Sequence, residues 1–407
     1  MSPLVIVVSI VLIDLLGFTI VMPLLAPFAK EYGFSPLQIG LLLAAFPFCQ
    51  LVAGPILGRL SDRFGRRPVL IASQAGTALS FVILGLSRNF WPMLLARMLD
   101  GASGGNILVA QAYVADITRP QDRARGFGLI GMAFGLGFVL GPILGLLILE
   151  LPVDAEWRLR MPFLVAAGFS VAALVLVATR LPESRPPEGL AKARARVLSI
   201  RGLRDTFTLP GVGRLVAIGS LDILAFAVLE GTFSLYLRDQ LGWTASGALA
   251  GFAALGFVSA LVQGGLIRKL VPILGETRLM LFGLAALAAG LAGLAEVRES
   301  LGLMVALVLV GVGQGLASPS ISGLLSRATP ADEQGAVFGA FTSAQTAARM
   351  INYLVANLLL GLWGPAAPFR EGAILALIAF ALAAWGARRP AIPAESKEVA
   401  SGMEPIG

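Results

Sequence analysis

The sequence predicts an all-α integral membrane protein with twelve transmembrane helices, arranged as two pseudo-symmetric six-helix bundles. Three observations lead to this fold class. The chain has 407 residues, of which 57% are hydrophobic and only 14% charged, and its mean hydropathy is +0.84. Its apolar runs are each close to the roughly 20 residues that a helix needs to cross a bilayer. Landmark residues of the first half recur in the second half.

The spans follow one another along the chain, separated for the most part by short polar turns. Lipid offers no hydrogen-bond partner to the backbone, so each span is expected to be a helix. Glycine is abundant, with 48 residues, and small residues let membrane helices pack closely. The predicted spans are 4–28, 36–57, 69–87, 91–115, 124–149, 160–180, 212–237, 245–267, 278–295, 301–326, 334–361 and 371–387.

The positive charges predict the orientation. Most of the 31 lysine and arginine residues lie in the loops on the side of 58–67, in the long middle loop and in the C-terminal tail. Such an excess marks the cytoplasmic side, so both termini are expected in the cytoplasm and the protein in the cytoplasmic (inner) membrane. The net charge of +7 therefore reflects membrane topology, and nucleic acid is not an expected partner.

Composition excludes several other functions. The chain has no histidine, which removes histidine proton relays and histidine metal sites. The single cysteine, Cys49, lies inside an apolar run and is expected to be a small packing residue. No phosphate-binding loop of the Gly-x-x-x-x-Gly-Lys-Ser/Thr type occurs, so an ATP-driven pump or a membrane enzyme is not expected. We expect no cofactor and no metal, and a monomer with lipid as its surroundings.

The two halves contain the same landmarks at nearly constant separation, which predicts a parallel repeat about an axis along the membrane normal. The corresponding pairs are Asp14 with Asp222, Gly65 with Gly275, Gly101 with Gly311, and Gly105 with Gly315. The predicted organisation is an N-terminal bundle (1–181), a cytoplasmic linker (182–210), a C-terminal bundle (211–389) and a tail (390–407).

Charged residues inside the spans are the main functional signal, because each is costly in lipid unless it is paired or hydrated. Four acids and two bases lie at such positions: Asp14, Arg97, Asp100, Asp222, Glu230 and Arg349. Arg97 and Asp100 are three residues apart, so they share one helix face and can pair. At least one of Asp14, Asp222 and Glu230 is expected to exchange a proton during the functional cycle.

The turn between the second and third spans carries five charges in ten residues, Gly58 to Arg67. Its pattern, Gly58-x-x-x-Asp62-Arg63-x-Gly65-Arg66-Arg67, resembles the signature of the major facilitator superfamily. The resemblance implies a cytoplasmic gate in which Arg66 pairs with Asp116. We further expect Asp62 to dock at the N-terminus of the span 334–361, near 335–339, because free N–H groups there favour an anion.

Two further motifs narrow the resemblance. Arg97 to Gly105 resembles the arginine motif of helix 4 in proton-coupled facilitators, with Asp100 in place of the usual glutamine. The glycine-rich fifth span, with Gly137, Gly141, Pro142 and Gly145, resembles the antiporter signature of drug/proton exporters. The first half is therefore similar to tetracycline-type exporters of the twelve-helix drug/proton antiporter family. Those exporters carry acids in helices 3 and 9, whereas 69–86 and 279–295 contain none here.

In the eleventh span, Gln345, Arg349 and Asn352 recur at helical spacing and form one polar stripe. We expect Arg349 to reach into a central cavity and pair with an acid of the seventh span, Asp222 in preference to Glu230. A static ion pair is the alternative to a working switch. Further polar and aromatic residues expected at the cavity are Gln50, Asn106 and Phe226.

The sequence thus predicts a secondary transporter, most simply a proton-coupled exporter of amphipathic or cationic small molecules that works by alternating access. Three alternatives stay open on the same scaffold: transport of sugars or amino acids, transport of lipid, and a membrane sensor without transport activity. The energy source in the leading hypothesis is the proton gradient.

Overall fold

The computed structural model describes residues 2–119, 123–184, 211–330 and 333–387, and these form helices and short connections. Serine caps with a following proline start the first two helices, and at Ser35 a capping box with Gln38 completes the start. The helices are α1 (Pro3–Glu31), α2 (Pro36–Phe64), α3 (Arg66–Leu86), α4 (Phe90–Ser103), α5 (Asn106–Ile117), α6 (Arg123–Leu149), α7 (Ala155–Arg158), α8 (Met161–Arg180), α11 (Val212–Leu241), α12 (Ala245–Leu261), a π-helical turn (Val262–Leu266), α13 (Ile267–Glu296), α14 (Ser300–Ala328), α15 (Gln334–Trp363) and α16 (Ala367–Ala387).

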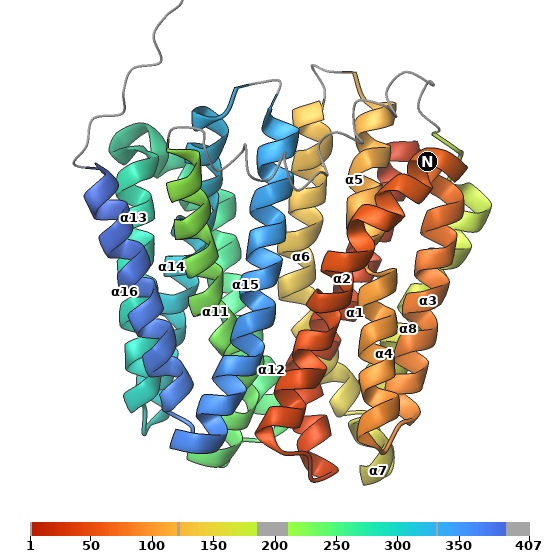
Figure 1. Cartoon of the computed structure of the whole chain (residues 1–407). Coiled ribbons are helices and arrows are strands. Elements are labelled where there is room, and N and C mark those ends of the chain that lie inside the picture. The colour runs from red at the N-terminus through yellow and green to blue at the C-terminus, as the bar shows by residue number, and fades with distance from the viewer. Residues whose placement is uncertain (1, 120–122, 185–210, 331–332, 388–407) are drawn as a thin grey trace, which may run out of the picture.

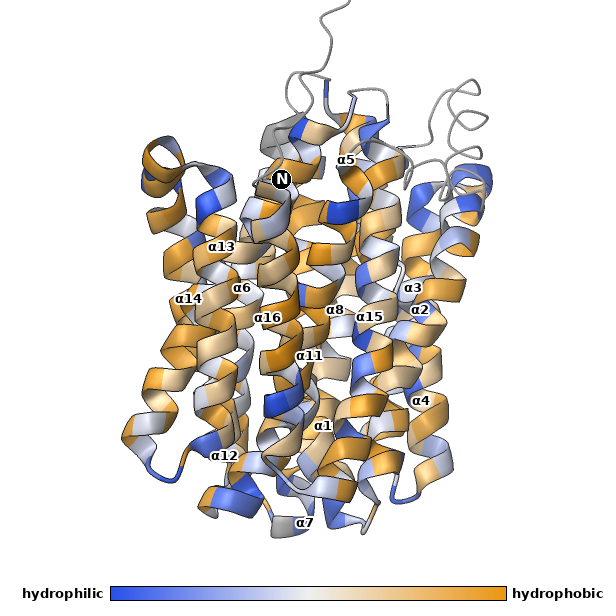
Figure 2. Cartoon of the chain, turned by 60° about the vertical axis from the view of Figure 1, so that its left-hand side comes forward, coloured by the Kyte–Doolittle hydropathy of each residue, from blue (hydrophilic) through white to orange (hydrophobic). Residues whose placement is uncertain are grey.

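The described helices are consistent with twelve membrane crossings. Nine stretches are long and apolar enough to cross a bilayer by themselves. The stretch 245–296 makes two of the crossings, because it reverses at Gly275. The remaining two are the interrupted pair α4–α5 and the more polar α15. Figure 1 shows the helices side by side, and Figure 2 shows that apolar residues predominate along the helices and that hydrophilic residues are more frequent toward the two ends of the bundle.

The charged turn is shorter than the sequence predicted. α2 continues through 58–64, and Gly65 alone separates it from α3. The φ of Gly65 is 102°, a region that side chains with a Cβ rarely adopt. A Cβ at Gly65 would also lie 2.5 Å from a carboxylate oxygen of Glu183. Glycine is therefore required here by conformation, whereas Gly58 lies within ordinary helix.

The predicted span 91–115 is broken at its centre. α4 ends at Ser103 and α5 begins at Asn106, with Gly104 and Gly105 forming a turn between them. The break frees the carbonyl of Gly104, which accepts a hydrogen bond of 3.1 Å from the Gln50 side chain. Gln50 was predicted to face the cavity, and the structure gives it this role in holding α2 to the break.

The two halves share a core at only one end of the bundle. We call the end at which α1 begins and α16 ends the upper end, as in Figure 1, and the opposite end the lower end. One hydrophobic cluster joins both halves, through residues such as Leu25, Leu43 and Tyr353 in the lower part. At the upper end each half has its own cluster. One contains residues of the first half, such as Ile6 and Leu181, and the other contains residues of the second half, such as Val212 and Ala383.

Direct contacts between the halves agree with this division. α2 packs on α15, where a Cβ at Gly40 would lie 2.9 Å from the carbonyl oxygen of Tyr353. α1 contacts α11, where the Ser234 hydroxyl donates a 2.7 Å hydrogen bond to the Pro23 carbonyl. α6 packs on α12 from mid-depth downward. Of the predicted linker only residues 182–184 belong to the described chain, and the predicted tail 390–407 lies outside it.

Candidate functional site

Arg97 and Asp100 form the ion pair that their spacing predicted. The guanidinium and carboxylate are 2.7 Å apart, and both side chains are buried. The Arg97 guanidinium also lies 4.8 Å from the centre of the Phe46 ring on α2, a favourable cation–π distance. Because both charges belong to one turn of α4, the pair is local and needs no other helix to form it.

Asp14 and Asp222, the equivalent acids of the two halves, are held by amides. The Gln74 side chain of α3 donates to both carboxylate oxygens of Asp14, at 2.8 and 2.7 Å, and Asn106 is buried at the start of α5. Gln314 of α14 lies 3.4 Å from Asp222, which is fully buried. Within the described chain neither acid has a basic partner at ion-pair distance.

Arg349 pairs with Glu230, at 3.0 Å, and the Tyr353 hydroxyl donates a 2.9 Å hydrogen bond to the same carboxylate. The preference for Asp222 as the partner was wrong. Eight residues separate the two acids, which turns α11 by roughly 80° beyond two full turns. Asp222 therefore faces α14, whereas Glu230 faces α15 at the depth of Arg349.

The rest of the predicted polar stripe on α15 divides between two neighbouring helices. Gln345 lies 3.5 Å from the Gly219 carbonyl of α11, whereas Asn352 donates to Glu371 of α16 at 3.1 and 3.3 Å. Sequence reasoning missed Glu371, because it stood at the edge of a predicted span. Its signal was an acid directly after Arg370 at the start of an apolar run. Phe226 packs against the hydrophobic core of the second half.

The glycine-rich motif of α6 packs closely against two helices, α1 and α12. A Cβ at Gly137 would lie 2.8 Å from that of Leu15, and one at Gly141 would lie 1.9 Å from the Thr19 hydroxyl oxygen. Thr19 donates to the Gly137 carbonyl at 2.9 Å, which ties α1 to α6. Gly145 instead faces Leu249 of the second half. Pro142 lies inside α6, next to Gly141. The motif thus connects packing within one half to the contact between halves.

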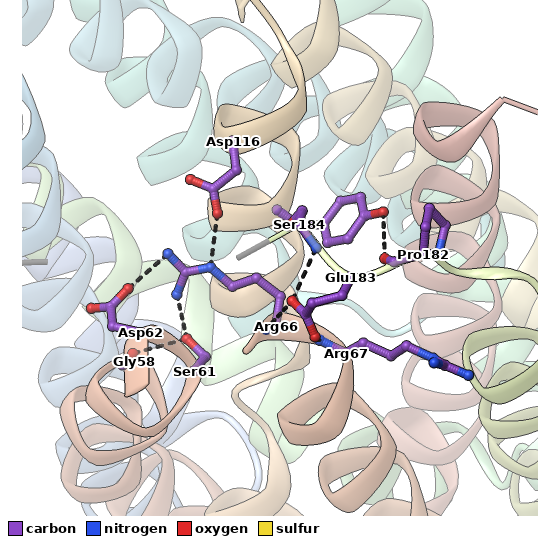
Figure 3. Close-up of polar contacts among 10 residues, drawn as sticks. Gly58, Ser61, Asp62, Arg66, Arg67, Asp116, Pro182, Glu183 and Ser184 are labelled. Carbon is purple, nitrogen blue, oxygen red and sulfur yellow. Dashed lines mark hydrogen bonds and ion pairs between the residues drawn. The ribbon is translucent and has the colours of Figure 1, made fainter. Parts of the chain in front are cut away.

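Arg66 is the centre of the upper-end cluster shown in Figure 3. Its buried guanidinium contacts Asp62 at 2.7 Å, Asp116 at 2.9 Å and the Ser61 hydroxyl at 2.5 Å. The predicted Arg66–Asp116 contact is therefore present. The docking of Asp62 on α15 stays a prediction, since residues 331–332 before that helix lie outside the described chain.

Further contacts anchor this cluster to the end of α8. The Glu183 carboxylate accepts hydrogen bonds from the backbone N–H groups of Arg66 at 2.8 Å and Arg67 at 3.2 Å. An anion at this position stabilises the N-terminus of α3. Arg63 lies over the neighbouring Phe64 ring, 5.2 Å from its centre, and takes no part in the buried pairs.

The second half has an ion pair equivalent to Arg66–Asp116, with the positions of acid and base exchanged. Gly275, with φ of 74°, occupies the place of Gly65, and the next residue is Glu276 where the first half has Arg66. Glu276 pairs at 3.1 Å with Arg327 near the end of α14, as Arg66 pairs with Asp116 near the end of α5. The sequence comparison of the halves matched Gly65 with Gly275 and overlooked this exchange of charges.

Two equivalent helical halves, charged pairs within the spans and a cluster of ion pairs at one end are the features of a membrane transporter. The model of the family described as Major Facilitator Superfamily matches residues 7–351, with a second match over 273–404. The chain belongs to the major facilitator superfamily.

Several relatives match over most of their length. The class G tetracycline resistance protein of Vibrio anguillarum is 31% identical over 347 residues, which cover 84% of this chain and 86% of the relative. Major facilitator superfamily domain-containing protein 10 of Homo sapiens is 28% identical, over 91% of this chain and 90% of the relative. The crystal structure of that human protein, described as an organic anion transporter, matches with a TM-score of 0.69, at 26% identity, over 93% of this chain and 98% of that one.

Proposed function

We propose that the protein is a proton-coupled exporter of amphipathic small molecules, including cationic ones, in the cytoplasmic membrane. The observation that carries the proposal is the setting of Asp14 and Asp222. They lie at equivalent places of the two halves, Asp222 fully buried and Asp14 partly buried, and both have amide partners without a counter-ion in the described chain. An unpaired buried carboxylate is costly, so a proton is expected to neutralise each acid when the site is closed to water.

The arrangement of the halves supports alternating access. Their shared core lies at the lower end, and their cores are separate at the upper end. We assign the upper end, where α1 begins and α16 ends, to the cytoplasm from the excess of basic residues in the loops of that side. On this assignment the structure is closed toward the outside, and rocking of the halves would open the lower end. No bound cofactor is required, because the proton gradient supplies the energy.

A specific observation favours a second candidate, the export of organic anions. Among the paired charges at mid-depth, Arg349 is the most open, with 35% of its side chain exposed against 8% for Glu230. An anionic group that reached Arg349 would compete with Glu230 for the guanidinium. Such competition would free the Glu230 carboxylate to take up a proton.

Transport into proteoliposomes tests and separates the two candidates. With an imposed pH gradient, uptake of the cation ethidium and of the anion fluorescein is measured in parallel. The leading proposal expects ethidium uptake that collapses when the gradient is dissipated, and the second candidate expects the same of fluorescein. Absence of ethidium uptake, or ethidium uptake that is the same without the pH gradient, would contradict the leading proposal. The same results with fluorescein would contradict the second candidate. Asp154→Asn, a change at an exposed lower-end residue, provides a matched control for the acid variants.

A further inference from the structure

A groove between α15 and α16 opens sideways near the lower end, and one acid, the partly buried Glu371, lies in its wall. The groove has a volume of about 590 Å³ and is walled by Val355, Leu359, Ile374 and Leu375. Two of these side chains are exposed on the outside of the bundle, Val355 by 37% and Ile374 by 57%. Residues exposed there face lipid, so the groove is accessible from the bilayer.

Glu371 lies in the wall of this groove with much of its acceptor capacity unused. Its two carboxylate oxygens receive the Asn352 amide, at 3.1 and 3.3 Å. A carboxylate offers about four lone-pair sites, and within the described chain no basic side chain lies at ion-pair distance from it. The groove therefore presents an acid whose natural complement is a cation that can donate hydrogen bonds.

The depth of the groove matches the boundary between lipid head groups and chains. Glu371 is the fifth residue of α16, about 6 Å along the axis from its start. Trp363, which also lines the groove and is 75% exposed, ends α15 at the same level. Exposed tryptophan is typical of this interface.

We propose that the groove binds a phospholipid with a primary ammonium head group, phosphatidylethanolamine, with one acyl chain along the apolar wall. The ammonium would donate charge-assisted hydrogen bonds to Glu371. Arg370, which is 63% exposed and pairs with Glu296 at 2.7 Å, stands at the rim where the phosphate would lie. The proposal does not depend on the transported substrate.

The groove is expected to select among phospholipids by their head group and not by their acyl chains. Lipid tails are as apolar as leucine, so the apolar wall alone gives no selectivity among lipids. The trimethylammonium group of phosphatidylcholine carries a charge but has no N–H to donate. Exchange of phosphatidylethanolamine for phosphatidylcholine therefore isolates the hydrogen bonds to Glu371.

Native mass spectrometry of the purified full chain, exchanged into mixed micelles that contain equal amounts of the two lipids, tests the site. We expect the wild type to retain phosphatidylethanolamine over phosphatidylcholine by about tenfold. Glu371→Gln should abolish this preference for one bound lipid. Equal retention by the wild type, or an unchanged preference in Glu371→Gln, would overturn the proposal.

A second pair of variants keeps the test decisive if Glu371→Gln folds poorly. Ile374→Trp fills the groove and leaves the carboxylate in place, so it should remove the same lipid. Ile378→Trp is the matched control, one turn further along α16, 48% exposed and outside the groove wall. Equal lipid retention by these two variants would show that the groove is not the binding site.

Discussion

The side chains of Arg349 and Glu230 are buried to different extents, so replacing one or the other should cost different amounts of unfolding free energy. Arg349→Gln leaves the Glu230 carboxylate, 8% exposed, with the Tyr353 hydroxyl as its remaining partner. Removing one partner of a buried pair costs about 3 kcal/mol. Glu230→Gln instead leaves Arg349, 35% exposed, able to bind water, and a cost of about 1–2 kcal/mol is expected. The arginine variant should therefore be the less stable of the two.

Equilibrium unfolding in mild detergent, followed by tryptophan fluorescence, measures these free energies. The double variant Arg349→Gln with Glu230→Gln leaves no unpaired charge, so it should recover to within about 1 kcal/mol of the wild type. Equal costs for the single variants, or additive costs in the double variant, would refute the reasoning. Gradient-driven transport by the stable double variant then separates a static pair, which leaves coupling intact, from a switch, whose loss removes it.

Three further predictions concern packing and the upper-end clusters. Gly141→Ala should destabilise by about 1–3 kcal/mol, since its Cβ would overlap Thr19, whereas Gly135→Ala, with open space at the Cβ, should be near neutral in thermal unfolding. Asp62→Asn should lower transport and leave the unfolding midpoint within a few degrees of the wild type; unchanged transport would contradict a gating role. Arg327→Glu should cost about 3 kcal/mol, because it leaves Glu276, only 12% exposed, without its cation, and Arg327→Glu combined with Glu276→Arg should recover most of the lost unfolding free energy.

What the sequence could predict depended on how local the interaction is. The apolar runs determine the spans, and the spacing of Arg97 and Asp100 within one turn was enough to predict their pair. The Arg66–Asp116 contact came from a motif resemblance. Both needed no knowledge of how one helix is rotated against another.

The predictions that were wrong or missing depend on how the helices are placed against one another. Choosing between Asp222 and Glu230 as the partner of Arg349 requires the rotation of α11 against α15, which a hydropathy pattern does not contain. The break at Gly104 was missed because glycine and serine, which surround it, also occur inside continuous membrane helices as packing residues. Glu371 was missed since its importance depends on Asn352 turning toward α16.

The central claim, that substrate movement is coupled to protons through Asp14 and Asp222, is tested most directly by letting the substrate drive the proton. Proteoliposomes containing the protein and a trapped pH-sensitive dye start without a pH gradient, and an ethidium gradient is then imposed. Wild type and the Asp154→Asn control should both move protons against the ethidium flow. Asp14→Asn with Asp222→Asn should abolish this proton movement while the protein stays folded. Ethidium transport without any pH change in the wild type, or an unchanged signal in the double variant, would contradict the account.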